Sequence, residues 1–246
     1  MKPFTYRDLR KVPDQPLTWP EEEPRLLQEL ERPGGRKGWV LRGLANLYRE
    51  AGRLDQAMVW VRRLVESATD LEDRAGAYLM WGQSYEQERD YEAAVRAYQL
   101  GYAMEPVDTD VWYFLNNNLG YSLIQLGRHS EAEPYLRAAT QINSSRANAF
   151  KNLGLALWGL QRPADAAQEF VQATQVTPSD PRAFWHLEQL VGKNPGLLRL
   201  QPALRQQVKD CRRAVRSTFK LNPGLREHWR RIWRSLPPRM GKGGRS

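Results

Sequence analysis

Residues 150–178 read FKNLGLALWGLQRPADAAQEFVQATQVTP, and this stretch decides the fold. Its first half places apolar residues three and four positions apart, at Phe150, Leu153 and Leu157, which is the spacing of one helix face. Its second half repeats that spacing from Ala166 onward. Between them lies the segment QRP, and a proline is tolerated at the start of a helix because the missing N–H has no helical partner there. The stretch therefore predicts two helices joined by a short turn.

The same two-helix pattern occurs four times along the chain. Four short segments align: GRLDQA at residues 52–57, RDYEAA at 89–94, GRHSEA at 127–132 and QRPADA at 161–166. Their first shared alanines are spaced 37, 38 and 34 residues apart, and each begins an apolar stripe at i, i+4 and i+7 of a second helix. One helix pair cannot bury its stripe alone, so neighbouring pairs must stack and cover one another.

This repeat resembles the tetratricopeptide repeat family, whose signature has Leu-Gly and an aromatic residue in the first helix, then Ala, an aromatic residue, Ala and Pro. The matching residues are Phe150, Leu153, Gly154, Leu157, Ala166, Phe170, Ala173 and Pro178 in the fourth unit, and Tyr78, Gly82, Tyr85, Ala94, Tyr98 and Pro106 in the second. The residues that depart from the signature are Ala45 and Thr69 in the first unit, and Asn116 and Ser144 in the third.

The resemblance implies an all-α fold, a right-handed α-solenoid of about four helix-turn-helix repeats with a flanking N-terminal helix and C-terminal capping helices. It covers residues 37–191, where a fifth first helix ends the regular array. The resemblance also implies a concave surface that holds other proteins, because the family acts mostly as a non-catalytic scaffold. Units two and three have three or four extra residues, at 66–74 and 107–112. We expect them in the turns, with longer helices as the alternative.

On each first helix, the residue after the first apolar anchor and those four and seven positions further on project away from the core. We expect this side to line a groove. Its residues are Arg42, Asn46, Arg49, Leu79, Gln83, Glu86, Asn117, Tyr121, Ile124, Lys151, Leu155, Trp158, Trp185 and Gln189, flanked by Asn152, Arg182 and His186.

Cations, amides and aromatic residues in one groove predict a binding site for a peptide segment of a partner protein, and the cations suit an acidic or carboxylate-bearing segment. Tyr121, Trp158 and Trp185 favour this interpretation, because aromatic residues are the usual anchors of interfaces. The alternative is that these residues form the solvated side of amphipathic helices. Some members of the family clamp the C-terminal carboxylate of heat-shock chaperones, but Met80 and Phe114 stand where that clamp needs Asn and a cation. Chaperone binding is therefore not expected.

The N-terminal flank, residues 1–36, contains six prolines and is expected to be a Pro-rich arm followed by a short helix. The helix is predicted over residues 20–31, PEEEPRLLQELE, because Pro and Glu favour a helix N-terminus. We expect Leu26, Leu27 and Leu30 to cover the open end of the first unit.

The C-terminal flank is strongly basic. Residues 192–246 have 15 Lys and Arg against two acidic residues, a net charge of +13, whereas residues 1–191 carry −4. We expect a basic helical extension over 192–236 and a disordered tail over 237–246. Two apolar stripes predict helices that pack back on the last unit. Their residues are Leu204, Val208, Cys211, Val215 and Phe219 in the first, and Leu225, Trp229, Ile232, Trp233 and Leu236 in the second.

The outer side of these helices predicts a surface for an acidic partner. Its residues are Arg205, Lys209, Arg212, Arg213, Arg216, Arg226, Arg230, Arg231 and Arg234. The alternative function is therefore association with RNA or DNA, since Arg pairs with phosphate and stacks on bases. An acidic protein or an anionic lipid surface satisfies the same electrostatics.

Several functional classes are not expected. The chain of 246 residues has no Gly-rich phosphate loop, nucleophile elbow or paired metal-ligand motif, so we expect neither an enzyme nor a cofactor. One cysteine, Cys211, allows no intrachain disulfide, so the composition either suits a reducing compartment or is indifferent to redox conditions. The longest nearly apolar run, residues 153–160, falls short of the roughly 20 residues of a spanning helix. We expect a cytoplasmic protein without a transmembrane segment.

Overall fold

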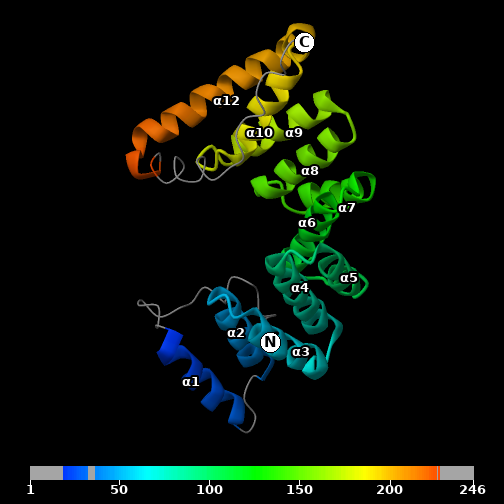
Figure 1. Ribbon diagram of the computed structural model, residues 1–246, viewed down its shortest axis with the longest axis vertical. Coiled ribbons are helices and arrows are strands. Elements are labelled where there is room, and N and C mark those ends of the chain that lie inside the picture. The colour runs from blue at the N-terminus through cyan, green and yellow to red at the C-terminus, as the bar shows by residue number, and fades with distance from the viewer. Residues whose placement is uncertain (1–18, 33–36, 226, 228–246) are drawn as a thin grey trace, which may run out of the picture. The chain divides into compact units, whose positions relative to one another are not determined.

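The computed structural model describes residues 19–32, 37–225 and 227, and every regular element in these residues is a helix (Figure 1). The chain divides into two compact units, Met1–Ile142 and Asn143–Ser246. The division falls inside the predicted 37–191 array, with three helix pairs in the first unit and one in the second. None of the described helices is long and apolar enough to cross a membrane.

The first unit contains a leading helix and three helix pairs. The leading helix is α1 (Trp19–Glu31), and the pairs are α2 (Lys37–Glu50) with α3 (Leu54–Ser67), α4 (Leu71–Glu88) with α5 (Tyr91–Tyr102), and α6 (Thr109–Gln125) with α7 (His129–Ile142). The two helices of each pair pack together, and α3 and α5 also pack on the first helix of the following pair. This is the stacking that the repeat predicts.

The second unit contains one further pair and a C-terminal cap. The pair is α8 (Ala147–Gly159) with α9 (Pro163–Val176), followed by α10 (Arg182–Lys193), the short α11 (Leu197–Leu200) and the long α12 (Pro202–Leu221). Helix α10 packs on α9 and α8, as a fifth first helix should, but α12 packs on α9 and α11. The predicted all-α fold of stacked helix-turn-helix repeats is confirmed.

Small residues on the first helices make room for large ones on the second. A methyl group on Gly154 of α8 would lie 2.6 Å from the Phe170 ring of α9, which is too close for any real carbon pair. Gly82 and Gly120 meet Tyr98 and Leu136 in the same way, and all three large partners are buried. In the first pair the equivalent residues are Ala45 and Val61, which share one core cluster. Because Val61 is smaller than Phe or Tyr, the methyl group of Ala45 fits beside it, which explains why this position is Ala and not Gly.

The four turns inside the pairs share one backbone conformation. The first residue of each aligned segment has a positive φ: Gly52 (72°), Arg89 (62°), Gly127 (74°) and Gln161 (59°). Glycine adopts this left-handed region freely, whereas other residues are strained there. The turn geometry is therefore conserved across the repeats even where the sequence does not supply glycine.

The extra residues of units two and three lengthen the first helices instead of the turns. Helix α4 has 18 residues and α6 has 17, against 14 in α2 and 13 in α8. Asp70 and Asp108 cap the two long helices, accepting hydrogen bonds from the backbone N–H of Asp73 and Val111, respectively. An N-cap carboxylate satisfies N–H groups that lack helical partners, so the longer helices start at these aspartates.

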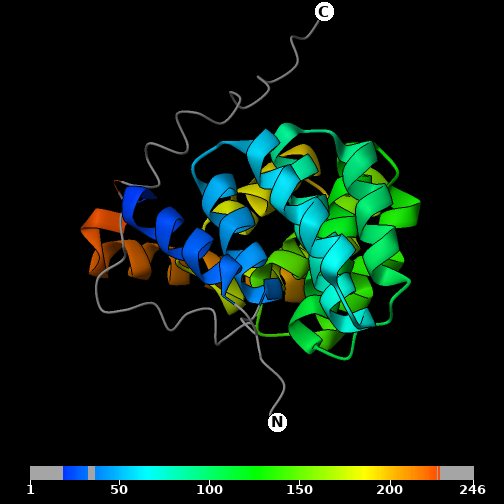
Figure 2. The ribbon, with the colours of Figure 1, turned by 90° about the horizontal axis from the view of Figure 1, so that it is seen from below.

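The predicted N-terminal helix is present as α1, which lies along α2 (Figures 1 and 2). Leu26 is buried and Leu30 packs against the core of the first pair. The prediction was wrong for Leu27, which remains 36% exposed because it falls outside the helix face that meets α2. The Tyr48 hydroxyl donates a hydrogen bond to Glu23 and ties the two helices together.

The first C-terminal apolar stripe forms the buried face of α12. Leu204, Val208, Cys211 and Val215 are all buried, and the Cys211 thiol lies 3.9 Å from the Val171 carbonyl oxygen of α9. The predicted packing of this helix on the last pair is confirmed. The arm over residues 1–17, the second stripe beyond Leu225, the tail over 237–246 and the cations Arg226, Arg230, Arg231 and Arg234 lie outside the described residues.

Candidate functional site

In the first unit, the predicted groove residues of α2 are held by polar contacts. Arg42 forms an ion pair with Asp73 of α4 at 3.5 Å, and the Arg49 guanidinium donates a hydrogen bond to the Asn46 amide oxygen at 3.1 Å. All three predicted residues, Arg42, Asn46 and Arg49, remain partly exposed. This surface is polar and ordered, with part of its charge already neutralised.

The predicted residues of α4 and α6 differ in exposure. Gln83 and Tyr121 are half-buried, and the Tyr121 ring meets the edge of Tyr91 at a centroid distance of 6.3 Å. Asn117 is only 7% exposed and its amide donates a hydrogen bond to Asn118 at 2.9 Å. Asn117 therefore presents little surface to a ligand, whereas Tyr121 presents part of its ring.

Glu86 of α4 links consecutive first helices. The Ser122 hydroxyl of α6 donates a hydrogen bond to its carboxylate at 3.0 Å. Burial raises the pKa of Glu86 to about 7, although the neighbouring hydroxyls of Tyr98 and Ser122 act in the opposite direction. This carboxyl group therefore titrates near neutral pH.

In the second unit, α8 and α10 bring two predicted cations together. Burial and the nearby charge of Arg182 lower the pKa of Lys151 to about 8, while Asp180 acts in the opposite direction. Arg182 forms an ion pair with Asp180 at 2.5 Å. Burial alone would raise the pKa of Asp180, but hydrogen bonds and the charge of Arg182 outweigh it and lower that pKa. Arg182 is thus paired with the Asp180 carboxylate, and Lys151 is close enough to feel the charge of both groups.

His186 lies beside this cation pair. Its ring stacks on Phe170 at 5.5 Å and meets Trp185 edge-on at 4.9 Å. Burial, followed by the charges of Lys151 and Arg182, lowers the pKa of His186 to about 4. At neutral pH this imidazole is therefore uncharged and acts as an aromatic and hydrogen-bonding group.

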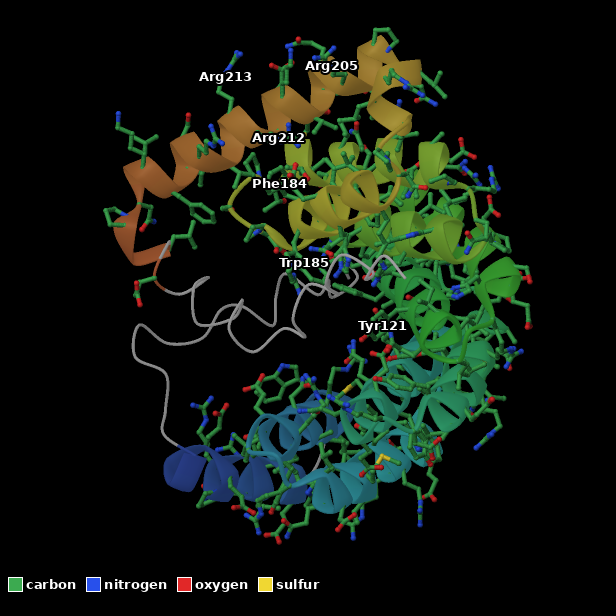
Figure 3. All side chains as sticks on the ribbon, turned by 45° about the horizontal axis from the view of Figure 1, so that its top comes forward. Tyr121, Phe184, Trp185, Arg205, Arg212 and Arg213 are labelled. Carbon is green, nitrogen blue, oxygen red and sulfur yellow. The ribbon has the colours of Figure 1, made fainter. Side chains whose placement is uncertain are left out.

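The two predicted tryptophans flank the same region. Trp158 is half-buried, meets Phe170 edge-on at 6.3 Å, and carries the Lys193 ammonium over its ring at 5.2 Å. Trp185 is also half-buried and points away from α12 (Figure 3). Both rings pack partly on their own unit and keep part of their surface open.

The remaining predicted residues of this unit differ from one another. Asn152 is 3% exposed and belongs to the interior, whereas Gln189 is half-buried on α10. Two charged residues near this region, Asp180 and Lys193, are not among the residues predicted from the sequence. Asp180 stands two positions before Arg182, which is a local signal for an ion pair, but no sequence signal places Lys193 over Trp158.

The outer side of α12 carries most of its predicted cations. Arg205, Lys209, Arg213 and Arg216 are exposed. Arg212 differs, because its guanidinium donates two hydrogen bonds to the Glu188 carboxylate of α10, at 2.9 and 3.2 Å. Figure 3 shows Arg213 pointing outward and Arg212 on the α10 side.

Among the described residues, no group of three or more His, Cys, Asp and Glu side chains is arranged to hold a metal ion.

Comparison with known proteins supports the helical-repeat fold. The family model described as tetratricopeptide repeat matches residues 79–147 and 117–184. No curated protein matches.

Several solved structures are similar to the chain. MamA (residue 41 to its end) from Desulfovibrio magneticus RS-1 is 17% identical with a TM-score of 0.59, over 74% of this chain and 97% of that one. YrrB, described as a TPR protein with an unusual peptide-binding site, is 18% identical with a TM-score of 0.54, over 86% and 98% of the two chains. Cut9–Hcn1 of the APC/C is 14% identical with a TM-score of 0.56, over 63% and 30%. At these identities the likeness is one of fold alone.

Proposed function

We propose that this chain, whose residues 79–184 match the tetratricopeptide repeat family, is a non-catalytic adaptor that binds a peptide segment of a partner protein. Proteins of this family bind other proteins, and YrrB, which shares the fold, is described as having a peptide-binding site. The proposal includes a cytoplasmic location, which suits a chain with one cysteine.

The observation that carries this proposal is that Lys151 and Arg182 lie close together, beside the carboxylate of Asp180. Burial and then the charge of Arg182 lower the pKa of Lys151, so the charge of Asp180 offsets the cost of a buried ammonium only in part. A bound carboxylate would offset the remaining cost and accept charge-assisted hydrogen bonds from both cations. We therefore propose that the second unit selects an acidic side chain or a C-terminal carboxylate.

The half-buried rings of Trp158 and Trp185 support a peptide rather than a small anion. Large aromatic side chains with an exposed edge are the common energetic anchors of protein interfaces. Both rings flank His186 or Phe170, so their orientation is fixed before a ligand arrives.

The proposal is tested by selecting random 12-residue peptides on the full-length chain and measuring the selected peptides by fluorescence anisotropy. We expect acidic peptides to be enriched. The double variant Lys151→Met/Arg182→Gln should lose about tenfold or more in affinity, because charge-assisted hydrogen bonds are each worth about 1.5–3 kcal/mol. Affinity should also fall as the pH rises from 7 to 9, since Lys151 loses its charge around pH 8.

The matched control is Arg199→Gln/Lys220→Gln, which removes the same charge from exposed positions of the second unit. Equal affinity in the two double variants, or enrichment of peptides without acidic residues, would contradict the proposed site. In Lys151→Met, the decline of affinity between pH 7 and 9 should disappear.

A further inference from the structure

One face of α12 presents a regular row of cations. This α12 basic face consists of Arg205, Lys209, Arg213, Arg216 and Lys220, all exposed. They follow one another at three- or four-residue steps, so they lie along one side of the helix and span about 22 Å of its axis at 1.5 Å per residue. The row is too long for one acidic side chain and suits a ligand whose negative charges repeat.

A shallow pocket lies within this row. It has a volume of about 430 Å³ and is lined by Lys209, Arg212, Arg213, Arg216 and Ser217. All five side chains donate hydrogen bonds, and four of them are cationic. Phosphate oxygens only accept hydrogen bonds, so the pocket matches a phosphate group in both charge and hydrogen bonding.

Part of the pocket wall is fixed by the fold. The paired hydrogen bonds between Arg212 and Glu188 hold the guanidinium in place on the α10 side. Asp210 lies 3.7 Å from Arg213 and accepts a hydrogen bond from Gln206, so it offsets one charge of the row. The remaining cations still outnumber it, and the charge is presented on a rigid helix.

Two other partners fit this face less well. A helix that lies on a membrane inserts its apolar side, but Leu204, Val208 and Val215 are buried inside the unit. A protein interface needs an apolar or aromatic core, and no apolar side chain lines the pocket. Interfaces with nucleic acid are more polar and far more positively charged, as this face is.

We propose that the α12 basic face binds the phosphate backbone of nucleic acid, without reading its sequence. The site is separate in its residues from the peptide site around Lys151 and Arg182. Arginine pairs with phosphate through its planar fork, and each phosphate contact releases condensed counterions. The binding is therefore strongly dependent on salt.

The test uses the full-length chain and fluorescently labelled 20-nucleotide RNA and 20-base-pair DNA of mixed sequence, titrated by anisotropy over a range of KCl concentrations. The triple variant Lys209→Gln/Arg213→Gln/Arg216→Gln should weaken binding about tenfold or more. It should also reduce the slope of log K against log[KCl] on duplex DNA by about two to three, since each phosphate contact contributes about 0.9.

The matched control is Arg25→Gln/Arg62→Gln/Arg96→Gln, which removes three exposed charges from the first unit. The variant Lys209→Arg/Arg213→Lys/Arg216→Lys, which keeps the charge, should retain the slope. Equal losses in the two charge-removing variants, or a salt-independent affinity, would overturn the proposal. So would α12-dependent binding to phosphatidylserine vesicles or to poly-glutamate with no binding to either nucleic acid. Circular dichroism melts confirm that each variant is folded.

Discussion

Gln161 occupies a turn position that glycine fills in two of the other pairs. Its φ of 59° is left-handed, like that of Gly52 and Gly127. A non-glycine residue in this left-handed region is strained by roughly 1–2 kcal/mol. Glycine is not strained there, but it loses more conformational entropy when the chain folds. The repeat geometry outweighs this local cost, because both flanking helices are held by their packing.

Replacing Gln161 with Gly should therefore stabilise the protein by about 0.5–1 kcal/mol, measured by thermal and urea unfolding. The matched control is Gln168→Gly, at an exposed position inside α9. This substitution should lower the free energy of unfolding by about 1 kcal/mol, because the backbone at residue 168 is helical and glycine has a low helix propensity. If both substitutions destabilise to the same extent, the turn is not strained.

Glu86 makes the first unit sensitive to pH. Its folded pKa of about 7 lies above the ordinary value of 4.5, so between these values the folded state binds more protons than the unfolded state. Stability from this group is therefore full below pH 4.5 and is lost as the pH rises through 7. The total effect is at most about 3 kcal/mol.

The variant Glu86→Gln should remove this dependence and be more stable than the parent at pH 8, because the amide carries no charge. Urea unfolding at pH 5, 6, 7 and 8 measures it. Glu88→Gln, on the same helix but exposed, serves as the control and should leave the pH profile unchanged. If the free energy of unfolding changes between pH 5 and 8 by the same amount in the parent, in Glu86→Gln and in Glu88→Gln, then Glu86 is not the titrating group.

At the scale of the element, α12 caps the second unit with one buried apolar face and one exposed cationic face. The buried stripe beginning at Leu204 covers α9, while the opposite face carries the cations. Replacing one large side chain of this stripe with alanine should leave a cavity, because the neighbouring helices relax only partly.

Leu204→Ala should thus cost about 2–5 kcal/mol in unfolding free energy, whereas Leu200→Ala, at a position 76% exposed on α11, should stay within about 0.5 kcal/mol. Chemical denaturation of both variants measures the difference. A similar small loss for both would mean that α12 does not depend on this contact.

The first helices show how element length follows from capping. The inserted residues at 66–74 and 107–112 were expected in turns, but Asp70 and Asp108 satisfy backbone N–H groups at new helix starts. A sequence pattern of core residues is the same whether the insertion lies in a turn or in an extra helical turn, so periodicity alone does not distinguish the two.

At the scale of the whole molecule, the chain has two compact units and a segregated charge. The first 191 residues carry −4 and the remainder +13, and the described part of that basic segment is the cap of the second unit. The peptide site proposed around Lys151 and the nucleic-acid site proposed on α12 both belong to the second unit. Under these two proposals, a protein partner and a polyanion would bind separate surfaces of the same unit.

Much of this site was accessible from the sequence. Helical periodicity identified Lys151 and Trp158 on the side opposite the core, with Arg182 as a flanking residue. The same periodicity also selected Leu79 and Asn117, with Asn152 as a flanking residue, and these three are buried, since helix–helix packing covers part of that side. The pairing of Arg212 with Glu188 and the position of Lys193 over Trp158 depend on the approach of different helices, which periodicity does not describe.

The amino-acid sequence by itself determined the repeated helix pair, its small and large core positions and the segregation of charge. These follow from residue types at fixed spacing along one chain. Only the tertiary structure decided which charges are compensated, which amides are buried, and that the buried carboxyl of Glu86 and the crowded ammonium of Lys151 titrate near neutral pH. These properties depend on desolvation and on distances between residues from different helices, which exist only after the helices have packed.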